Sequence, residues 1–66
     1  MTYYTDEQGN RRFYDRRCKI SVEPDTGDTW FVWDSKNLRQ YDRYSTLRHA
    51  NAAAKIIAKN SALKSP

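Results

Sequence analysis

Cys18 and His49 are the side chains of this 66-residue chain that most readily act as a nucleophile or a general base. Catalysis needs a partner group within hydrogen-bond reach, and neither residue has one in its sequence neighbourhood. Cys18 falls in an alternating apolar pattern, where a free thiol behaves as a small hydrophobic side chain. His49 lies on the flank of a predicted helix. Because the chain also lacks a glycine-rich phosphate loop and a paired-histidine motif, we expect no enzymatic activity.

Metal sites and cofactors are not expected either. One cysteine and one histidine cannot supply the four ligands of a structural zinc site. Residues 25–28 (Asp-Thr-Gly-Asp) resemble part of a calcium loop, but the spaced carboxylates and the closing glutamate of an EF-hand are missing, so a turn explains them better. A single cysteine excludes an internal disulfide. No segment has the apolar length of a signal peptide or a membrane span, which predicts a cytoplasmic protein with no membrane partner.

Basic residues gather in two parts of the sequence. The chain has 12 Lys and Arg against 8 Asp and Glu, a net charge of +4, and residues 43–66 contain five bases and no acid. A second basic group lies within residues 11–19. Local clusters of this kind attract phosphates, and flat aromatic rings stack on bases.

The sequence therefore predicts a small, non-enzymatic nucleic-acid-binding module. Its ligand would be single-stranded nucleic acid, or a nucleic acid whose sugar-phosphate backbone is contacted without recognition of the bases. A basic and aromatic face of the sheet and the basic C-terminal helix would bind it. The candidate binding residues are Arg11, Arg12, Tyr14, Arg16, Arg17, Lys19, Phe31, Trp33, Arg48, Lys55 and Lys59.

A protein-binding module is the alternative. Tyr, Trp and Arg are enriched at the energetic centres of protein interfaces. Such a module could be a small inhibitor, an adaptor or an assembly subunit that binds an acidic protein surface, or a homodimer that completes a thin core by self-association. Salt dependence separates the two classes, because only phosphate contacts release many counterions. No run of residues is specific enough to name a family.

Strand patterns dominate the first half of the chain. Residues 17–23 alternate, with Cys18, Ile20 and Val22 on one side, and residues 29–34 form a second strand after the turn-forming segment 24–28. Residues 11–16 form a further strand, and residues 3–5 could add a short edge. Residues 35–44 are either a loop or a short strand around 38–41 leading into the helix.

A helix is predicted over residues 46–60. Ser45 or Thr46 supplies its N-cap, and Leu47, Ala50, Ala54 and Ile57 recur at helical spacing on the side that packs on the sheet. The fold class is therefore α+β: a small antiparallel sheet of three strands, or four with the short edge, with one C-terminal helix on one face. Residues 1–61 form a single domain, and residues 62–66 are a frayed tail.

The hairpin register decides which aromatic residues are available to a ligand. With residues 24–28 as the loop, Glu23 faces Thr29, so that Val22 pairs with Trp30 and Ile20 with Val32 on the helix-covered face. The other face then pairs Ser21 with Phe31 and Lys19 with Trp33, and Arg17 lies at its edge. This register predicts an exposed aromatic patch beside bases, which is typical of a binding surface.

Overall fold

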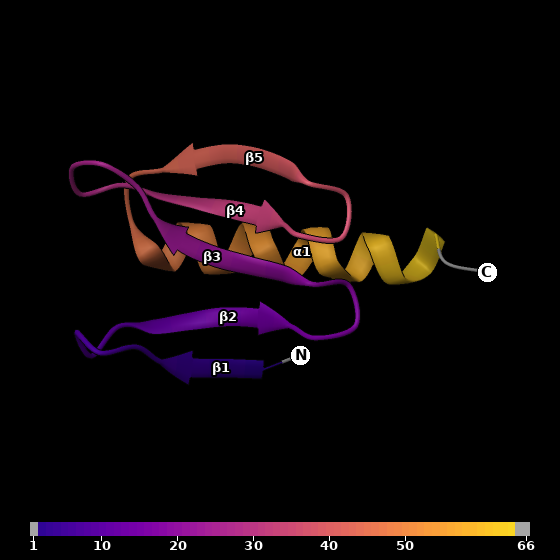
Figure 1. Cartoon of the computed structure of the whole chain (residues 1–66), viewed down its shortest axis with the longest axis horizontal. Coiled ribbons are helices and arrows are strands. Elements are labelled where there is room, and N and C mark those ends of the chain that lie inside the picture. The colour runs from indigo at the N-terminus through magenta and orange to yellow at the C-terminus, as the bar shows by residue number, and fades with distance from the viewer. Residues whose placement is uncertain (1, 65–66) are drawn as a thin grey trace.

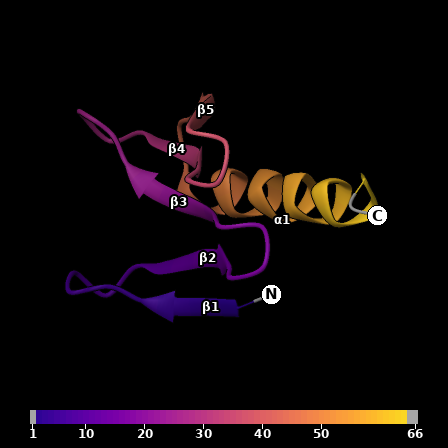
Figure 2. The same cartoon turned by 45° about the vertical axis from the view of Figure 1, so that its right-hand side comes forward.

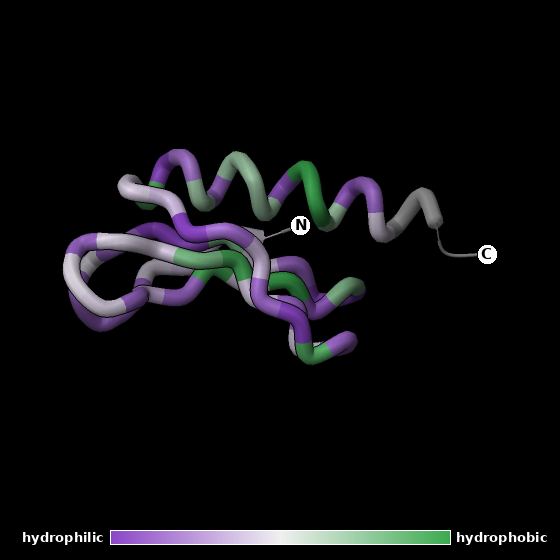
Figure 3. Tube along the Cα trace, turned by 90° about the horizontal axis from the view of Figure 1, so that it is seen from above, coloured by the Kyte–Doolittle hydropathy of each residue, from purple (hydrophilic) through white to green (hydrophobic). Residues whose placement is uncertain are grey.

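Five antiparallel strands follow one another as a meander, and one helix crosses one face of the sheet (Figure 1). The computed structural model describes residues 2–64. Seen from above, the helix and the sheet form two layers (Figure 3). The α+β class is confirmed, but the strands number five rather than three or four. The elements are β1 (Thr2–Thr5), β2 (Arg11–Asp15), β3 (Ile20–Pro24), β4 (Trp30–Asp34), β5 (Arg39–Tyr44) and α1 (Leu47–Lys64).

Two aspartate-capped turns explain the strand bounds that the alternation pattern missed. Asp15 ends β2 and Asp34 ends β4, and the Oδ1 atom of each accepts the backbone N–H groups two and three residues later. The fourth residue after each aspartate adopts a left-handed backbone, with φ of 57° at Lys19 and 53° at Leu38. Residues 16–19 are therefore a turn, and β3 begins at Ile20 rather than at residue 17. The second turn makes residues 39–44 a full strand.

The register between β3 and β4 differs from the prediction by two residues, yet the side chains that lie in these two strands keep their predicted faces. Ser21 pairs with Trp33, Val22 with Val32 and Glu23 with Phe31. All five predicted pairs are therefore wrong: Glu23–Thr29, Val22–Trp30, Ser21–Phe31, Ile20–Val32 and Lys19–Trp33. The loop is residues 25–29, closed by a hydrogen bond from the N–H of Asp25 to the carbonyl oxygen of Thr29 at 2.9 Å. The observed loop lies one residue later than the predicted loop, and this changes the partner of each β3 residue by two positions along β4. Because side chains alternate between faces with a period of two, a shift of two positions leaves each side chain on the same face.

The core lies between α1 and the sheet, as the spacing of its apolar residues predicts. The helix stripe is mainly alanine, which lets the helix approach the sheet closely. Leu47 and Ile57 pack against this core while partly exposed, and Cys18 does so from the β2–β3 turn rather than from a strand. The fully buried apolar residues are Phe13, Ile20, Val22, Val32, Ala50, Ala54 and Ala58.

The helix begins at its predicted cap and extends beyond its predicted end. The hydroxyl oxygen of Thr46 accepts the N–H of His49 at 3.2 Å, as an N-cap does. The helix continues through Lys64 instead of ending near Asn60, because no glycine or proline interrupts residues 47–64. Residues 62–64 are thus helical rather than part of a tail, and residues 65–66 lie outside the described residues.

Strands β2 and β3 separate after two paired positions, Tyr14–Ser21 and Asp15–Ile20 (Figure 2). Backbone groups of β2 that β3 would otherwise satisfy are bonded by the helix instead. The Asn51 side chain accepts the N–H of Phe13 at 2.9 Å and donates to the carbonyl oxygen of Arg11 at 2.9 Å. One carboxamide thereby replaces a neighbouring strand and ties the β1–β2 hairpin to α1.

Ala54→Lys tests the packing of the helix. A lysine at this fully buried position places an unpaired charge between the two layers, so we expect the variant not to fold. Ala52→Lys is the matched control, since Ala52 is exposed on the same helix. Circular dichroism melting checks both variants, and an unshifted transition for Ala54→Lys would contradict this packing.

Asn51→Ala tests the bond between the helix and the β1–β2 hairpin. The substitution leaves a backbone donor and a backbone acceptor without protein partners, at a cost of about 1–3 kcal/mol of unfolding free energy. Asn60→Ala removes an exposed asparagine from the same helix and should change stability little. Urea denaturation of both variants measures the difference, and equal midpoints would show that the Asn51 contacts are not stabilising.

Candidate nucleic-acid interface

An open groove lies between the first turns of α1 and the β1–β2 hairpin. Its volume is about 700 Å³, and three of the predicted binding residues, Arg11, Arg48 and Lys55, line it. Among the described residues no carboxylate lines the groove, so these cations have no competing anion within that lining. The lining residues are Tyr3, Gly9, Asn10, Arg11, Leu47, Arg48, Asn51, Ala52 and Lys55.

Tyr3 gives this groove an aromatic surface. Its ring meets the buried ring of Phe13 edge to face, with centroids 5.6 Å apart and planes at 78°. The guanidinium of Arg11 lies 4.7 Å from the centroid of the Tyr3 ring. Tyr3 nevertheless stays 39% exposed. Because this guanidinium lies over one face of the Tyr3 ring, the two groups form a stacked pair, and a nucleobase can stack on an outer face of that pair.

The start of α1 adds to the positive potential. Its first turn contains no acidic residue and carries Arg48. Unpaired N–H groups at a helix N-terminus give this end a partial positive charge, which favours anions. Asn51 holds the backbone of Arg11 against the helix, so the two walls of the groove keep their spacing.

The face of the sheet away from the helix, called the open face below, carries the predicted aromatic residues. Register places Tyr14, Ser21, Trp33 and Gln40 in one row across the strands, and Tyr4, Arg12, Glu23, Phe31 and Arg43 in a second. Phe31 and Trp33 are partly exposed there, as predicted. They line a hollow of about 460 Å³ together with Glu23, Pro24 and Gln40.

The cations expected beside these rings are absent from the open face. Lys19 and Arg17 lie in the β2–β3 turn at the end of the sheet, and the neighbours of Trp33 in the ladder are Ser21 and Gln40. The reason is the turn: β3 begins only at Ile20, so neither base is in a strand. The predicted basic and aromatic surface is therefore divided between two sides of the molecule.

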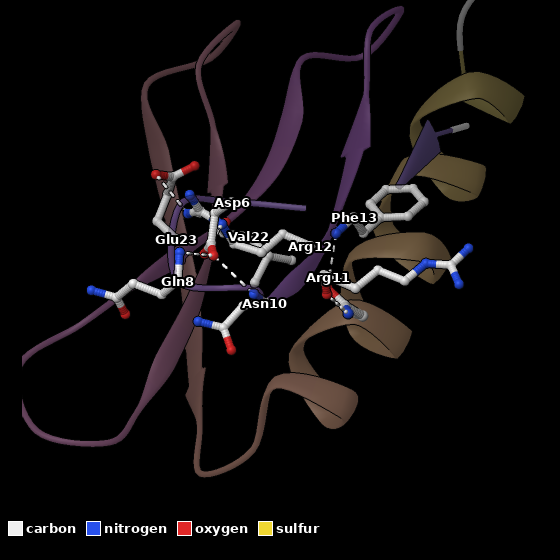
Figure 4. Close-up of polar contacts among 9 residues, drawn as sticks. Asp6, Gln8, Asn10, Arg11, Arg12, Phe13, Val22 and Glu23 are labelled. Carbon is white, nitrogen blue, oxygen red and sulfur yellow. Dashed lines mark hydrogen bonds and ion pairs between the residues drawn. The ribbon is translucent and has the colours of Figure 1, made fainter. Parts of the chain in front are cut away.

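Arg12 lies on the open face but is engaged by its neighbours (Figure 4). Its guanidinium is 3.1 Å from a carboxylate oxygen of Asp6 and 3.5 Å from one of Glu23, and it donates to the carbonyl oxygen of Val22 at 3.1 Å. It also lies 5.1 Å from the centroid of the Tyr4 ring. Only 14% of its side chain is exposed. Arg12 thus connects β2 to β3 at the point where the two strands separate. Because its guanidinium already contacts two carboxylates and a carbonyl oxygen, it is poorly available to bind a phosphate.

The remaining candidates lie at the end of the sheet or farther along the helix. Arg16, Arg17 and Lys19 are exposed in the β2–β3 turn. Lys59 is exposed one helical turn beyond Lys55 and does not line the groove. Tyr3 was missing from the predicted set; its proximity to Arg11 follows from the β1–β2 pairing, in which Tyr3 faces Phe13.

Cys18 lies in an environment that disfavours the reactive thiolate. Burial, and secondarily the carboxylate of Asp15, raise the pKa of the Cys18 thiol. Its Sγ atom is 3.5 Å from the carbonyl oxygen of Ala58. Among the described residues, no three His, Cys, Asp or Glu side chains are grouped as metal ligands would be. Within the same residues, α1 is not apolar enough to span a membrane.

Comparison with known proteins adds no functional information. No protein family matches the chain, and no curated protein or solved structure shows a significant similarity to it. The case for a function therefore depends on the geometry of the chain itself.

Asp6 predicts a pH dependence of stability in the β1–β2 loop. The hydrogen bond from the N–H of Asn10 lowers the pKa of Asp6 most strongly, and desolvation, the second-largest effect, opposes it. The N–H of Gln8 and the charge of Arg12 lower the pKa further, so the net shift is downward. A lowered folded-state pKa contributes stability that is present above pH 3.8 and is lost as the pH falls through the folded value. Asp6→Asn should flatten this acid limb, and Glu7→Gln in the same loop should not. Melting temperature against pH measures both, and identical acid limbs for wild type and Asp6→Asn would contradict the assignment.

Proposed function

We propose that the chain is a non-enzymatic module that binds single-stranded nucleic acid in the groove between α1 and the β1–β2 hairpin. The observation that carries this proposal is the convergence of Arg11, Arg48 and Lys55 around a groove with no carboxylate in its lining. Arg11 comes from β2, whereas Arg48 and Lys55 lie two helical turns apart on α1, so the fold brings together bases from two distant segments.

The groove residues divide the recognition between charge and stacking. Arg48 and Lys55 project from α1 and contact phosphate oxygens, supported by the positive end of the helix. Tyr3 and Arg11 on the opposite wall form a stacked pair whose outer face can receive a base. Stacking and phosphate contacts carry little sequence information, so the module discriminates weakly between sequences.

A single strand fits this arrangement better than a duplex. A paired base presents only its edges to a protein, whereas an unpaired base exposes the ring face that Tyr3 and Arg11 can cover. The groove is open along its length and lies beside an exposed helix face, so a flexible strand can follow it.

Lys55→Ala and Lys59→Ala form a matched pair that tests the groove. Both lysines are exposed on α1, but only Lys55 lines the groove. Lys55→Ala should weaken binding of a labelled oligothymidylate and reduce the slope of log affinity against log salt by about 0.7, the value for one phosphate contact on a single strand. Lys59→Ala should change neither quantity appreciably.

Fluorescence anisotropy at several salt concentrations provides both measurements. Tyr3→Ala should lower the affinity without changing the salt slope, because a stacking contact releases no counterions, while Trp33→Ser on the open face should leave binding intact. Equal effects of Lys55→Ala and Lys59→Ala would refute the groove as the site. Absence of binding at low salt would refute the function.

A further inference from the structure

The open face of the sheet has no second layer over it among the described residues. It presents Tyr4, Tyr14, Phe31 and Trp33 in two rows, and its two cations are in ion pairs: Arg12 with Asp6 and Glu23, and Arg43 with Asp25 at 2.6 Å. The core on the other face is small and owes three of its seven fully buried apolar residues to alanine. An aromatic sheet face of this kind is typical of an interaction surface.

The two ends of the sheet carry opposite charge. In a meander, alternate connections lie at the same end, and Figure 1 shows the β1–β2 and β3–β4 loops at one end and the β2–β3 and β4–β5 turns at the other. Residues 6–10 and 25–29 contain four carboxylates and no base. Arg12 and Arg43 pair with Asp6 and Asp25, so Glu7 and Asp28 carry the excess negative charge of this end. Residues 16–19 and 35–38 contain four bases and no acid.

The turns at the basic end are held together, so their charges form one patch. Ser35 donates from its N–H at 3.1 Å and from its hydroxyl at 3.2 Å to the carbonyl oxygen of Lys19. Arg16, Arg17, Lys19 and Lys36 are all exposed on these turns. At the acidic end Glu7 and Asp28 are exposed, and no ion pair involves either of them within the described residues.

We propose that a second copy of this chain covers the open face, with each strand of one copy running opposite to the same strand of the other copy. A two-fold axis between the sheets and perpendicular to the strands places each acidic end against the basic end of the partner copy. The same axis stacks the aromatic rows of the two sheets, in a two-sheet sandwich with a spacing of about 10 Å. A two-fold axis parallel to the strands would oppose like charges.

The size of the face sets the strength of this dimer. Five strands spaced about 4.8 Å apart and about 17 Å long cover roughly 400 Å² in projection, which belongs to the class of small, reversible interfaces. An interface of this size predicts weak association, so the dimer is to be sought at concentrations up to millimolar. Because α1 faces outward in both copies, the groove proposed for nucleic acid stays accessible, and self-association does not depend on that function.

Two charge variants and their mixture test the orientation. The acidic-end variant is Glu7→Lys with Asp28→Lys, and the basic-end variant is Arg17→Glu with Lys36→Glu. Either variant alone loses both attractive end contacts, so its dimer should dissociate about tenfold more readily or more. In an equimolar mixture, one copy supplies an unaltered acidic end and the other an unaltered basic end, and these two ends meet. The mixture should therefore recover a species of twice the 7.8 kDa monomer mass in sedimentation velocity.

Two further variants identify the face. Arg48→Glu with Lys55→Glu makes the same charge change on the helix side and should leave the dimer intact. Trp33→Ser should remain folded by circular dichroism but weaken the dimer, because it removes the largest ring of the open face. The proposal is overturned if the wild type is monomeric at millimolar concentration, if Trp33→Ser dimerises normally, or if the mixture stays monomeric. It is equally overturned if the open face binds the oligothymidylate instead.

Discussion

The separation of β2 from β3 is the constraint on which the rest of this structure depends. A sheet that splits leaves backbone N–H and C=O groups without partners, and such groups destabilise a fold unless something else satisfies them. Here Asn51 bonds β2 from the helix side, and Arg12 bonds the carbonyl of Val22 from the open face. One polar side chain on each side of the sheet thus holds the β1–β2 hairpin in place.

This arrangement also creates the groove. Because β2 is held by Asn51 rather than by a continuous ladder, the hairpin and the helix form two walls with Arg11 and Tyr3 on one side and Arg48 and Lys55 on the other. The polar contact that stabilises the fold is therefore also the floor of the candidate site. A side chain that looked like an ordinary helix residue in the sequence connects the fold to its proposed function.

Periodicity predicted the layers well. The alternation of Ile20 and Val22 and the helical spacing of Ala50 and Ala54 predict the core correctly. The pattern also predicts the correct face for Trp33, although it predicts the wrong pairing partner. Period-two patterns are insensitive to shifts of two residues, so they determine faces better than registers.

Turn chemistry was the main source of error. Lys19 and Leu38 adopt a left-handed backbone although neither is a glycine. Glycine is the residue that usually signals this conformation in a sequence, so the two turns are hard to recognise. Asp15 and Asp34 stabilise these turns through side-chain bonds whose partners can be recognised only once the backbone bends. The alternation pattern therefore predicts a strand through residues 17–19, which form a turn. It also does not distinguish a loop from a strand at residues 39–44, which form β5.

The same turns explain why charge and aromatic surface lie apart. A base inside a strand would alternate onto one face of the sheet, whereas a base in a turn lies at the end of the sheet, outside the register. Arg17 and Lys19 consequently contribute to the polarity between the two ends, while Phe31 and Trp33 remain in the ladder without free cations. The chain thus has a basic helix side and an aromatic face flanked by ends of opposite charge. The proposed nucleic-acid groove and the proposed dimer face lie on different sides of the fold and do not compete.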